Sequence, residues 1–194
     1  MTRTETIAPV ANAADAAWCD EVLRFWFDAL SPEAWWHKDD VLDGHIHQRF
    51  GALYEAVASQ APLLPGDART ALATVIVLDQ FPRNMFRGHA RAYATDAQAR
   101  ALAKAAIAGG LASSLSKDER LFLYMPLQHS EDADDQRRSV ELVSTLGDEE
   151  LTHFALAHQR IIDRFGRFPH RNAILGRRST PEEIEFLQSP ASSF

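Results

Sequence analysis

Cysteine and lysine are the residues that this sequence lacks most clearly. Its 194 residues include one cysteine, Cys19, which excludes an internal disulfide bond and a cysteine-based zinc site. There are 3 lysines against 17 arginines, and the net charge is −7. Because binding to a nucleic-acid backbone requires many cations on one surface, we expect no nucleic-acid partner.

Long apolar segments are also absent. The longest apolar run is Val75-Ile76-Val77-Leu78, far shorter than the roughly 20 residues that a membrane-spanning helix needs. Near the start of the chain, Arg3 and Glu5 interrupt any apolar stretch of the signal-peptide kind. The sequence therefore predicts no membrane partner and a cytoplasmic location.

Several signatures of chemistry are missing too. The sequence has no glycine-rich phosphate loop, no Gly-x-Ser-x-Gly turn and no His-Glu-x-x-His motif. We therefore expect no cofactor and no bound metal. No nucleophile stands beside a recognisable base and orienting group, so the sequence leaves open whether the protein is an enzyme.

Hydrophobic periodicity predicts an all-α fold. Between residues 40 and 60, apolar side chains recur with the three-and-four spacing of an amphipathic helix, and no segment alternates strictly as a half-buried strand does. About eight helices with short links indicate stacked antiparallel helical hairpins of a tetratricopeptide-like kind. We predict a loose leader at residues 1–14 and a single helical domain at residues 15–190.

Capping residues predict where several helices begin and end. Asp67 is expected to cap a central helix that is apolar nearly all round and stops at Pro82. Thr95 is expected to cap the next helix. Capping boxes at Ser116 and Thr180 predict two further helix starts.

Arginine is concentrated near the end of the chain. The segment from His158 to Arg178 contains a single acid, Asp163, and six arginines. These are Arg160, Arg164, Arg167, Arg171, Arg177 and Arg178. The planar guanidinium group suits bidentate binding of a carboxylate or a phosphate. The alternative for this cluster is that its arginines pair with internal acids such as Asp79 and Glu131. The alternative for the high arginine count is the base composition of the genome.

A short motif occurs twice, each time directly after a long apolar helix. Phe81-Pro82-Arg83-Asn84 is answered by Phe168-Pro169-His170-Arg171-Asn172. Asp79 lies at the end of the buried face before the first copy, where a carboxylate needs a cation or backbone N–H groups. Asp79 is then either part of a salt bridge between two helix ends or the acid that orients an arginine lining a pocket.

The stretch 125–132 places His129 beside Glu131 and Asp132. A histidine near a carboxylate can act as a general acid or base around neutral pH. His158 is surrounded by apolar residues and is predicted to be a core histidine. Four tryptophans lie in the first 36 residues, where core packing is their usual role, although Trp35 or Trp36 could line a groove.

Three ordered segments carry a family resemblance. They are residues 79–88 (Asp-Gln-Phe-Pro-Arg-Asn-Met-Phe-Arg-Gly), 126–132 (Pro-Leu-Gln-His-Ser-Glu-Asp) and 164–172 (Arg-Phe-Gly-Arg-Phe-Pro-His-Arg-Asn). They resemble the signatures of a largely bacterial family catalogued as domain of unknown function 924, from about Val22 to Leu187. The resemblance implies a helical fold similar to tetratricopeptide repeats and no established activity. The short link from Gln60 to Asp67 departs from the longer, tryptophan-containing segment expected in relatives.

The leading hypothesis is a pocket for a small anionic ligand at the helix ends, with catalysis left open. In it, His129, Glu131 and His170 orient the ligand or move a proton. The predicted ligand-binding residues are Asp79, Arg83, Asn84, Arg164, Arg167, Arg171 and Asn172. Two alternatives remain: a helical scaffold that binds a peptide or protein partner in a concave groove, and a set of motifs that only locks helix ends together.

Overall fold

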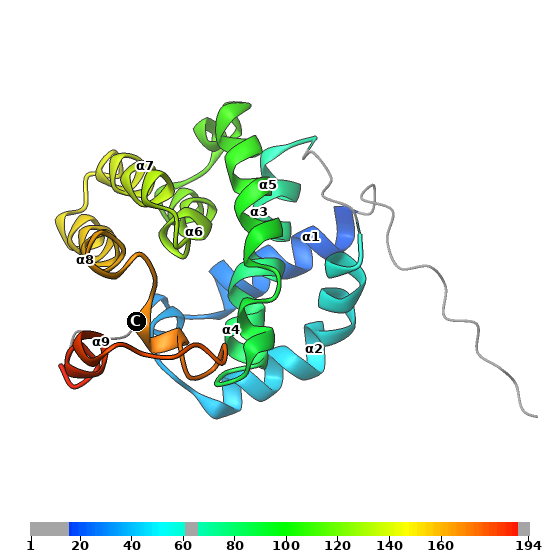
Figure 1. Cartoon of the computed structure of the whole chain (residues 1–194). Coiled ribbons are helices and arrows are strands. Elements are labelled where there is room, and N and C mark those ends of the chain that lie inside the picture. Colours follow the sequence, from blue (N-terminus) through cyan, green and yellow to red (C-terminus); the bar gives the residue numbers. More distant parts are fainter. Residues whose placement is uncertain (1–15, 61–65, 190–194) are drawn as a thin grey trace, which may run out of the picture.

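The protein is described by a computed structural model that covers residues 16–60 and 66–189. Within these ranges every regular element is a helix, which confirms the all-α prediction (Figure 1). The predicted leader at 1–14 and most of the link from Gln60 to Asp67 lie outside the described residues. The α-helices are α1 (Ala16–Leu23), α2 (Asp40–Ala58), α3 (Ala68–Val75), α4 (Phe81–Met85), α5 (Asp96–Ala108), α6 (Lys117–Gln128), α7 (Ala133–Ser144), α8 (Glu149–Phe165) and α9 (Pro181–Phe186).

The two halves of the chain pack differently. From α5 to α8 each helix contacts the next one in sequence, as helical hairpins do, and Figure 1 shows α6, α7 and α8 side by side. In the first half, α1 packs on α3, and α2 packs on α4. After α8 the chain runs across towards the lower end of α4 and then returns to α9 (Figure 1). The tetratricopeptide-like stacking stays a prediction.

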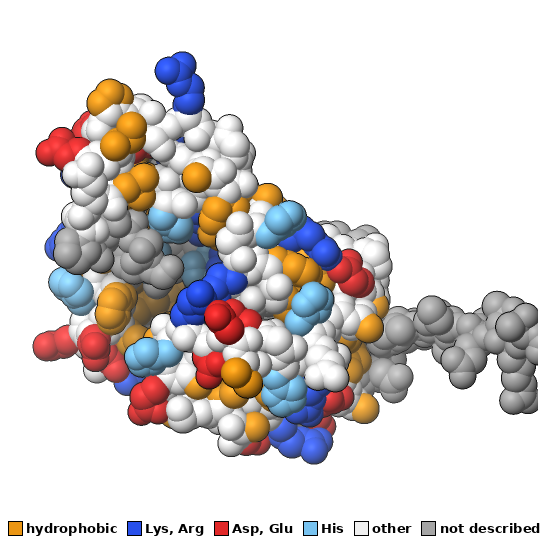
Figure 2. All heavy atoms as spheres, turned by 90° about the horizontal axis from the view of Figure 1, so that it is seen from below, with side chains coloured by type: hydrophobic (Ala, Val, Ile, Leu, Met, Phe, Trp, Pro, Cys, Tyr) orange, Lys and Arg blue, Asp and Glu red, His pale blue; other side chains and the backbone are white. Residues whose placement is uncertain are grey.

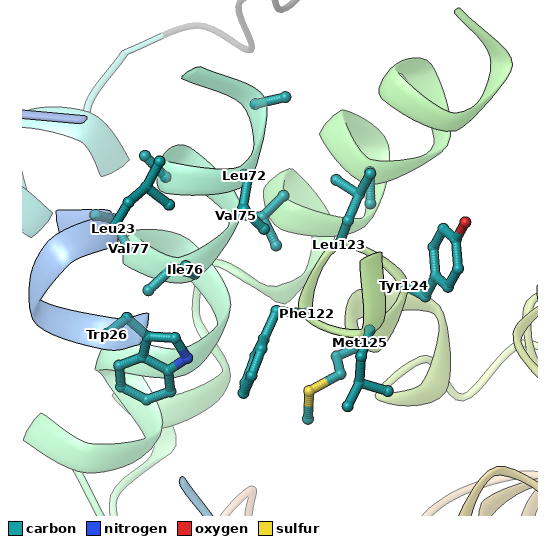
Figure 3. Close-up of a cluster of buried hydrophobic side chains, with 14 of the residues drawn as sticks. Leu23, Trp26, Leu72, Val75, Ile76, Val77, Phe122, Leu123, Tyr124 and Met125 are labelled. Carbon is teal, nitrogen blue, oxygen red and sulfur yellow. The ribbon is translucent and has the colours of Figure 1, made fainter. Parts of the chain in front are cut away.

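An aromatic core lies between these halves. The indole ring of Trp26 lies 5.8 Å from the ring of Phe81 and 5.5 Å from that of Phe122, measured between centroids. Figure 3 shows Trp26 and Phe122 beside apolar side chains of α3 and η3 (Ile76–Gln80), and the apolar side chains of both segments are buried as predicted for the central helix. Each such aromatic contributes about 1.5–3 kcal/mol through burial, so this core fixes the helix ends around it.

Helix starts mostly follow the predicted caps. The Asp67 carboxylate accepts a hydrogen bond from the backbone N–H of Thr70, and capping boxes are present at Ser116 and Thr180. No helix in the described ranges is long and apolar enough to cross a membrane.

One predicted boundary and one predicted cap are wrong, although α5 does begin directly after Thr95. The central helix does not stop at Pro82 but continues through the π-helical segment η3 into α4. Pro82 has no N–H to give to the carbonyl of Leu78, and the Thr95 hydroxyl donates to that carbonyl instead, at 2.6 Å. Thr95 therefore makes no side-chain cap for α5. This bond ties the start of α5 to the π-helical turn that carries Asp79.

Candidate functional site

A buried carboxylate–histidine pair lies at the centre of the candidate site. Asp79 is fully buried, and its two carboxylate oxygens each lie 2.9 Å from Nδ1 of His129, the residue that directly follows α6. The side-chain amide of Gln80 donates to Asp79 at 2.7 Å, and a guanidinium nitrogen of Arg83 lies 3.3 Å from it. Burial raises the pKa of Asp79, but Arg83 and His129 outweigh it and hold the pKa at about 2. Asp79 is therefore ionised at neutral pH.

The tautomer of His129 follows from this contact. An ionised carboxylate only accepts hydrogen bonds, so the proton of a neutral His129 is on Nδ1 and the lone pair is on Nε2. Burial and then Arg83 lower the pKa of His129 below its ordinary value, against the opposing effect of Asp79. The predicted partners, Glu131 and Asp132, are not the ones that contact this imidazole. Asp79 is 50 positions away in the sequence, and no local pattern indicates it.

Two arginines meet at one acid beside this pair. The guanidinium group of Arg83 donates two hydrogen bonds to Asp96, at 2.9 and 3.0 Å. Arg171, from η6 (Pro169–Arg171), reaches the same carboxylate with one nitrogen at 3.5 Å. Both guanidinium carbons lie over the ring of Tyr93, at 5.7 Å for Arg83 and 4.7 Å for Arg171. Neither Asp96 nor Tyr93 was predicted.

The repeated motif explains why these arginines converge. In both copies the phenylalanine is fully buried, the arginine contacts Asp96, and the asparagine donates to another acid. Asn84 donates to Asp43 at 2.8 Å, and Asn172 donates to Glu183 at 3.2 Å. The buried phenylalanines anchor two chain segments that are far apart in sequence, so their arginines point at one place.

Arg171 and its neighbour His170 keep unused hydrogen-bonding groups. Arg171 is 7% exposed, and its Nε has no hydrogen-bond partner among residues 16–60 and 66–189. The buried Nδ1 of His170 likewise has no partner in these ranges. Burial, followed by the adjacent Arg83, lowers the pKa of Arg171 below its usual value. A buried cation with so few hydrogen bonds is costly, which distinguishes Arg171 from the other arginines of the cluster.

The remaining predicted residues contact acids away from the Asp79–His129 pair. Arg167 binds Glu183 through two nitrogens, at 2.6 and 2.8 Å, and Glu183 also accepts from Asn172. Those hydrogen bonds, first of all from Arg167, lower the pKa of Glu183 to about 2. We call Arg167, Asn172 and Glu183 the C-terminal lock. Arg164 pairs with Glu182 at the surface, with half of the arginine side chain exposed.

Glu131 belongs to a second closed contact. Its carboxylate accepts two hydrogen bonds from Arg177, at 2.7 and 2.9 Å, and one from the backbone N–H of Phe168, at 2.8 Å. Burial raises the pKa of Glu131, but the hydrogen bonds from Arg177 and Phe168 and the charges of Arg177 and Arg171 together outweigh it and lower the pKa below its usual value. Glu131 is therefore ionised and already holds the start of η6, the segment that carries His170 and Arg171.

The surface of this region is polar and uneven. Figure 2 views the molecule from the end on which α4 and α9 lie, and shows histidine and Lys/Arg side chains gathered in and around a hollow.

His158 is buried as predicted, and burial lowers its pKa to about 3. Within residues 16–60 and 66–189, no group of three or more His, Cys, Asp or Glu side chains is arranged to hold a metal ion.

Comparison with known proteins identifies the family. The model of the family described as "Bacterial protein of unknown function (DUF924)" matches residues 22–191. The chain belongs to this family. It is also similar to a solved structure, "Protein of Unknown Function ATU0120 from Agrobacterium tumefaciens", with 44% sequence identity and a TM-score of 0.83 over 89% of this chain and 98% of that one. No curated protein matches the chain. Neither match carries an assigned activity.

Proposed function

We propose that the protein binds a small anionic metabolite through Arg171, with Arg83 beside it and His129 and His170 as neutral polar neighbours. The observation that carries this proposal is the incomplete hydrogen bonding of Arg171. Its five N–H donors can hold a carboxylate or phosphate in bidentate fashion. The preceding residue, His170, adds an imidazole whose Nδ1 has no hydrogen-bond partner in the described ranges.

The charge distribution supports an anion. Arg83 occupies Asp96 with two short hydrogen bonds, which leaves Arg171 only the 3.5 Å contact with that carboxylate. Burial, followed by Arg171, lowers the pKa of His170 to about 4, so this imidazole adds no charge at neutral pH. An incoming anion would therefore contact Arg171, whose charge is incompletely paired, and the imidazole of His170, which is already largely buried and neutral.

Location and other partners are part of the proposal. We place the binding function in the cytoplasm, without nucleic acid or membrane, because the sequence has a net charge of −7 and no long apolar run. One observation favours the scaffold alternative: Trp36 is 54% exposed and stacks on Phe122, with 6.0 Å between ring centroids. Trp35 is partly buried and donates to the carbonyl of Trp26.

Thermal unfolding in a panel of anions tests the proposal. A ligand present at a hundred times its dissociation constant adds about 2.7 kcal/mol and raises the midpoint of wild type by roughly 5–10 °C. Phosphate, short dicarboxylates and short acidic peptides form the panel. The variant Arg171→Ala should lose the response, whereas Arg164→Ala, which removes a half-exposed arginine, should keep it.

The unliganded variants separate a pocket from a lock. Arg171→Ala leaves Asp96 held by Arg83, so no buried acid loses its partner and the midpoint should change little. A flat panel together with a strongly destabilised Arg171→Ala would contradict the proposal. A response to peptides alone that survives Arg171→Ala and is lost in Trp36→Ala would favour the scaffold alternative.

A further inference from the structure

Asp79 does not need His129 to neutralise its charge. Asp79 already has a cation in Arg83 and a hydrogen bond from Gln80. The contact with His129 adds a fixed ring orientation and a fixed tautomer, because both carboxylate oxygens lie 2.9 Å from Nδ1. In the described part of the chain the side-chain hydrogen bonds of His129 all use Nδ1, and none engages Nε2. A neutral imidazole held in this way presents a lone pair to whatever lies beside it.

Arg83 lies between the proposed anion site at Arg171 and the lone pair of His129. Arg83 contacts Asp79 on one side and Asp96 on the other, and Asp96 is the acid that Arg171 also reaches. A small molecule held by Arg171 therefore lies in the same cluster as His129. No serine, threonine or cysteine of the described ranges forms a hydrogen bond with His129. Water, which requires no further side chain, is therefore the simplest nucleophile for this base.

We infer that His129 is a general base that activates water to hydrolyse an ester bond in an anionic metabolite held by Arg171. The inference rests on the proposed function for the choice of ligand. Asp79 is a positioning residue, because it keeps the proton on Nδ1 and stabilises the imidazolium that forms. Arg171 fixes the anionic group of the ester.

The reaction is complete with water alone. Nε2 of His129 takes a proton from water while the water oxygen bonds to the acyl carbon. The imidazolium then gives this proton to the departing alkoxide oxygen as the acyl–oxygen bond breaks. The products are a carboxylic acid and an alcohol, and His129 returns to its neutral form.

The charged surroundings define the pH dependence. The groups that face His129 are Asp79 from η3, Arg83 from α4 and Asp96 from α5, with His158 from α8 and His170 from η6. Base catalysis requires the unprotonated imidazole, so the rate falls as the pH decreases through the pKa of His129. Asp79 raises the pKa of His129, so removing its charge should move the midpoint of the pH profile to lower pH.

Two chromogenic esters test the inference on the whole protein. Mono-para-nitrophenyl succinate carries an anion next to its ester, and para-nitrophenyl acetate does not. We expect wild type to hydrolyse the succinate ester about 100-fold faster than His129→Gln does, which is the usual contribution of a general base. Asp79→Asn should be slower than wild type with the lower pH midpoint, and Arg171→Ala should lose the preference for the succinate ester. His153→Gln, which changes an exposed histidine on α8, is the control and should keep the wild-type rate.

The outcomes separate the two proposals. If neither ester is hydrolysed faster by wild type than by a folded His129→Gln, the inference is overturned, whatever the anion panel shows. If both esters are hydrolysed equally and the rate depends on His129, the base is supported and the anion site of the proposed function is not. Circular dichroism of each variant shows whether a lost rate reflects lost folding, and the pH profile of Asp79→Asn distinguishes positioning from stability alone.

Discussion

Arg167 and Arg171 lie four residues apart in one motif, yet their surroundings are opposite. Arg167 gives two short hydrogen bonds to Glu183 inside the C-terminal lock, and a third to the carbonyl of Arg178 at 2.9 Å. Arg171 gives one long hydrogen bond to Asp96, although it is the more deeply buried of the two. The comparison teaches that the number of arginines in a cluster says little about function. The N–H donors of an arginine that have no partner in the protein are the better indication of a ligand site.

The largest expected effect is a loss of stability in acid, which should come from the region around Arg171 and not from the C-terminal lock. Burial lowers the pKa of His158 to about 3 and that of His170 to about 4, whereas an unfolded histidine titrates near about 6.5. The unfolded state therefore binds more protons below that pH, and stability must fall as the pH decreases. By about pH 4 each of these histidines should cost about 3 kcal/mol, which denaturant titrations at neutral and acidic pH would measure.

The lock should resist the same acid. The pKa of Glu183 is about 2, so its carboxylate stays ionised and paired at about pH 4. His170→Gln removes one titrating group near Arg171 and should flatten the loss of stability with acid. Equal slopes for wild type and His170→Gln would mean that His170 is not buried in its neutral form.

Breaking the lock should have the next largest effect. Glu183→Ala leaves Arg167 and Asn172 without their shared acceptor and should lower the free energy of unfolding by about 3 kcal/mol. Glu183 is 2% exposed. Denaturant unfolding of this variant measures the loss, and phosphate binding through Arg171 should survive at temperatures where the variant is folded.

The neighbouring acid provides a matched control with the smallest effect. Glu182→Ala removes a 59% exposed side chain that pairs with Arg164, and exposed pairs of this kind contribute less than about 1 kcal/mol. If Glu182→Ala and Glu183→Ala were equally destabilising, the contacts of Glu183 would not act as a lock.

The sequence predicted the fold where the deciding interactions are local. Asp67, Ser116 and Thr180 bond to N–H groups within three residues, so their residue types and spacing sufficed. Thr95 has the same chemistry, but its hydroxyl bonds to the carbonyl of Leu78, 17 positions away, which Pro82 leaves without a helical donor. A tertiary partner of this kind cannot be read from spacing.

The candidate site was predicted by residue type more than by pairing. The repeated motif brought Arg83 and Arg171 into one hypothesis, and both contact Asp96. Asp96 itself gave no signal, because an acid at the start of a helix is ordinary capping chemistry. Glu131 stands two residues from His129 in the sequence, yet it binds Arg177, because the chain turns after α6.

The most direct measurement follows the Nε–H groups of Arg167 and Arg171 by nuclear magnetic resonance in isotope-labelled protein while inorganic phosphate or succinate is added. Arg167→Lys and Arg171→Lys assign the two signals. The account predicts a saturable shift of the Arg171 signal with at least one of the two anions, while the Arg167 signal, already bound to Glu183, stays unchanged. An Arg171 signal that does not move with either anion would contradict the claim that its unused donors form an anion site.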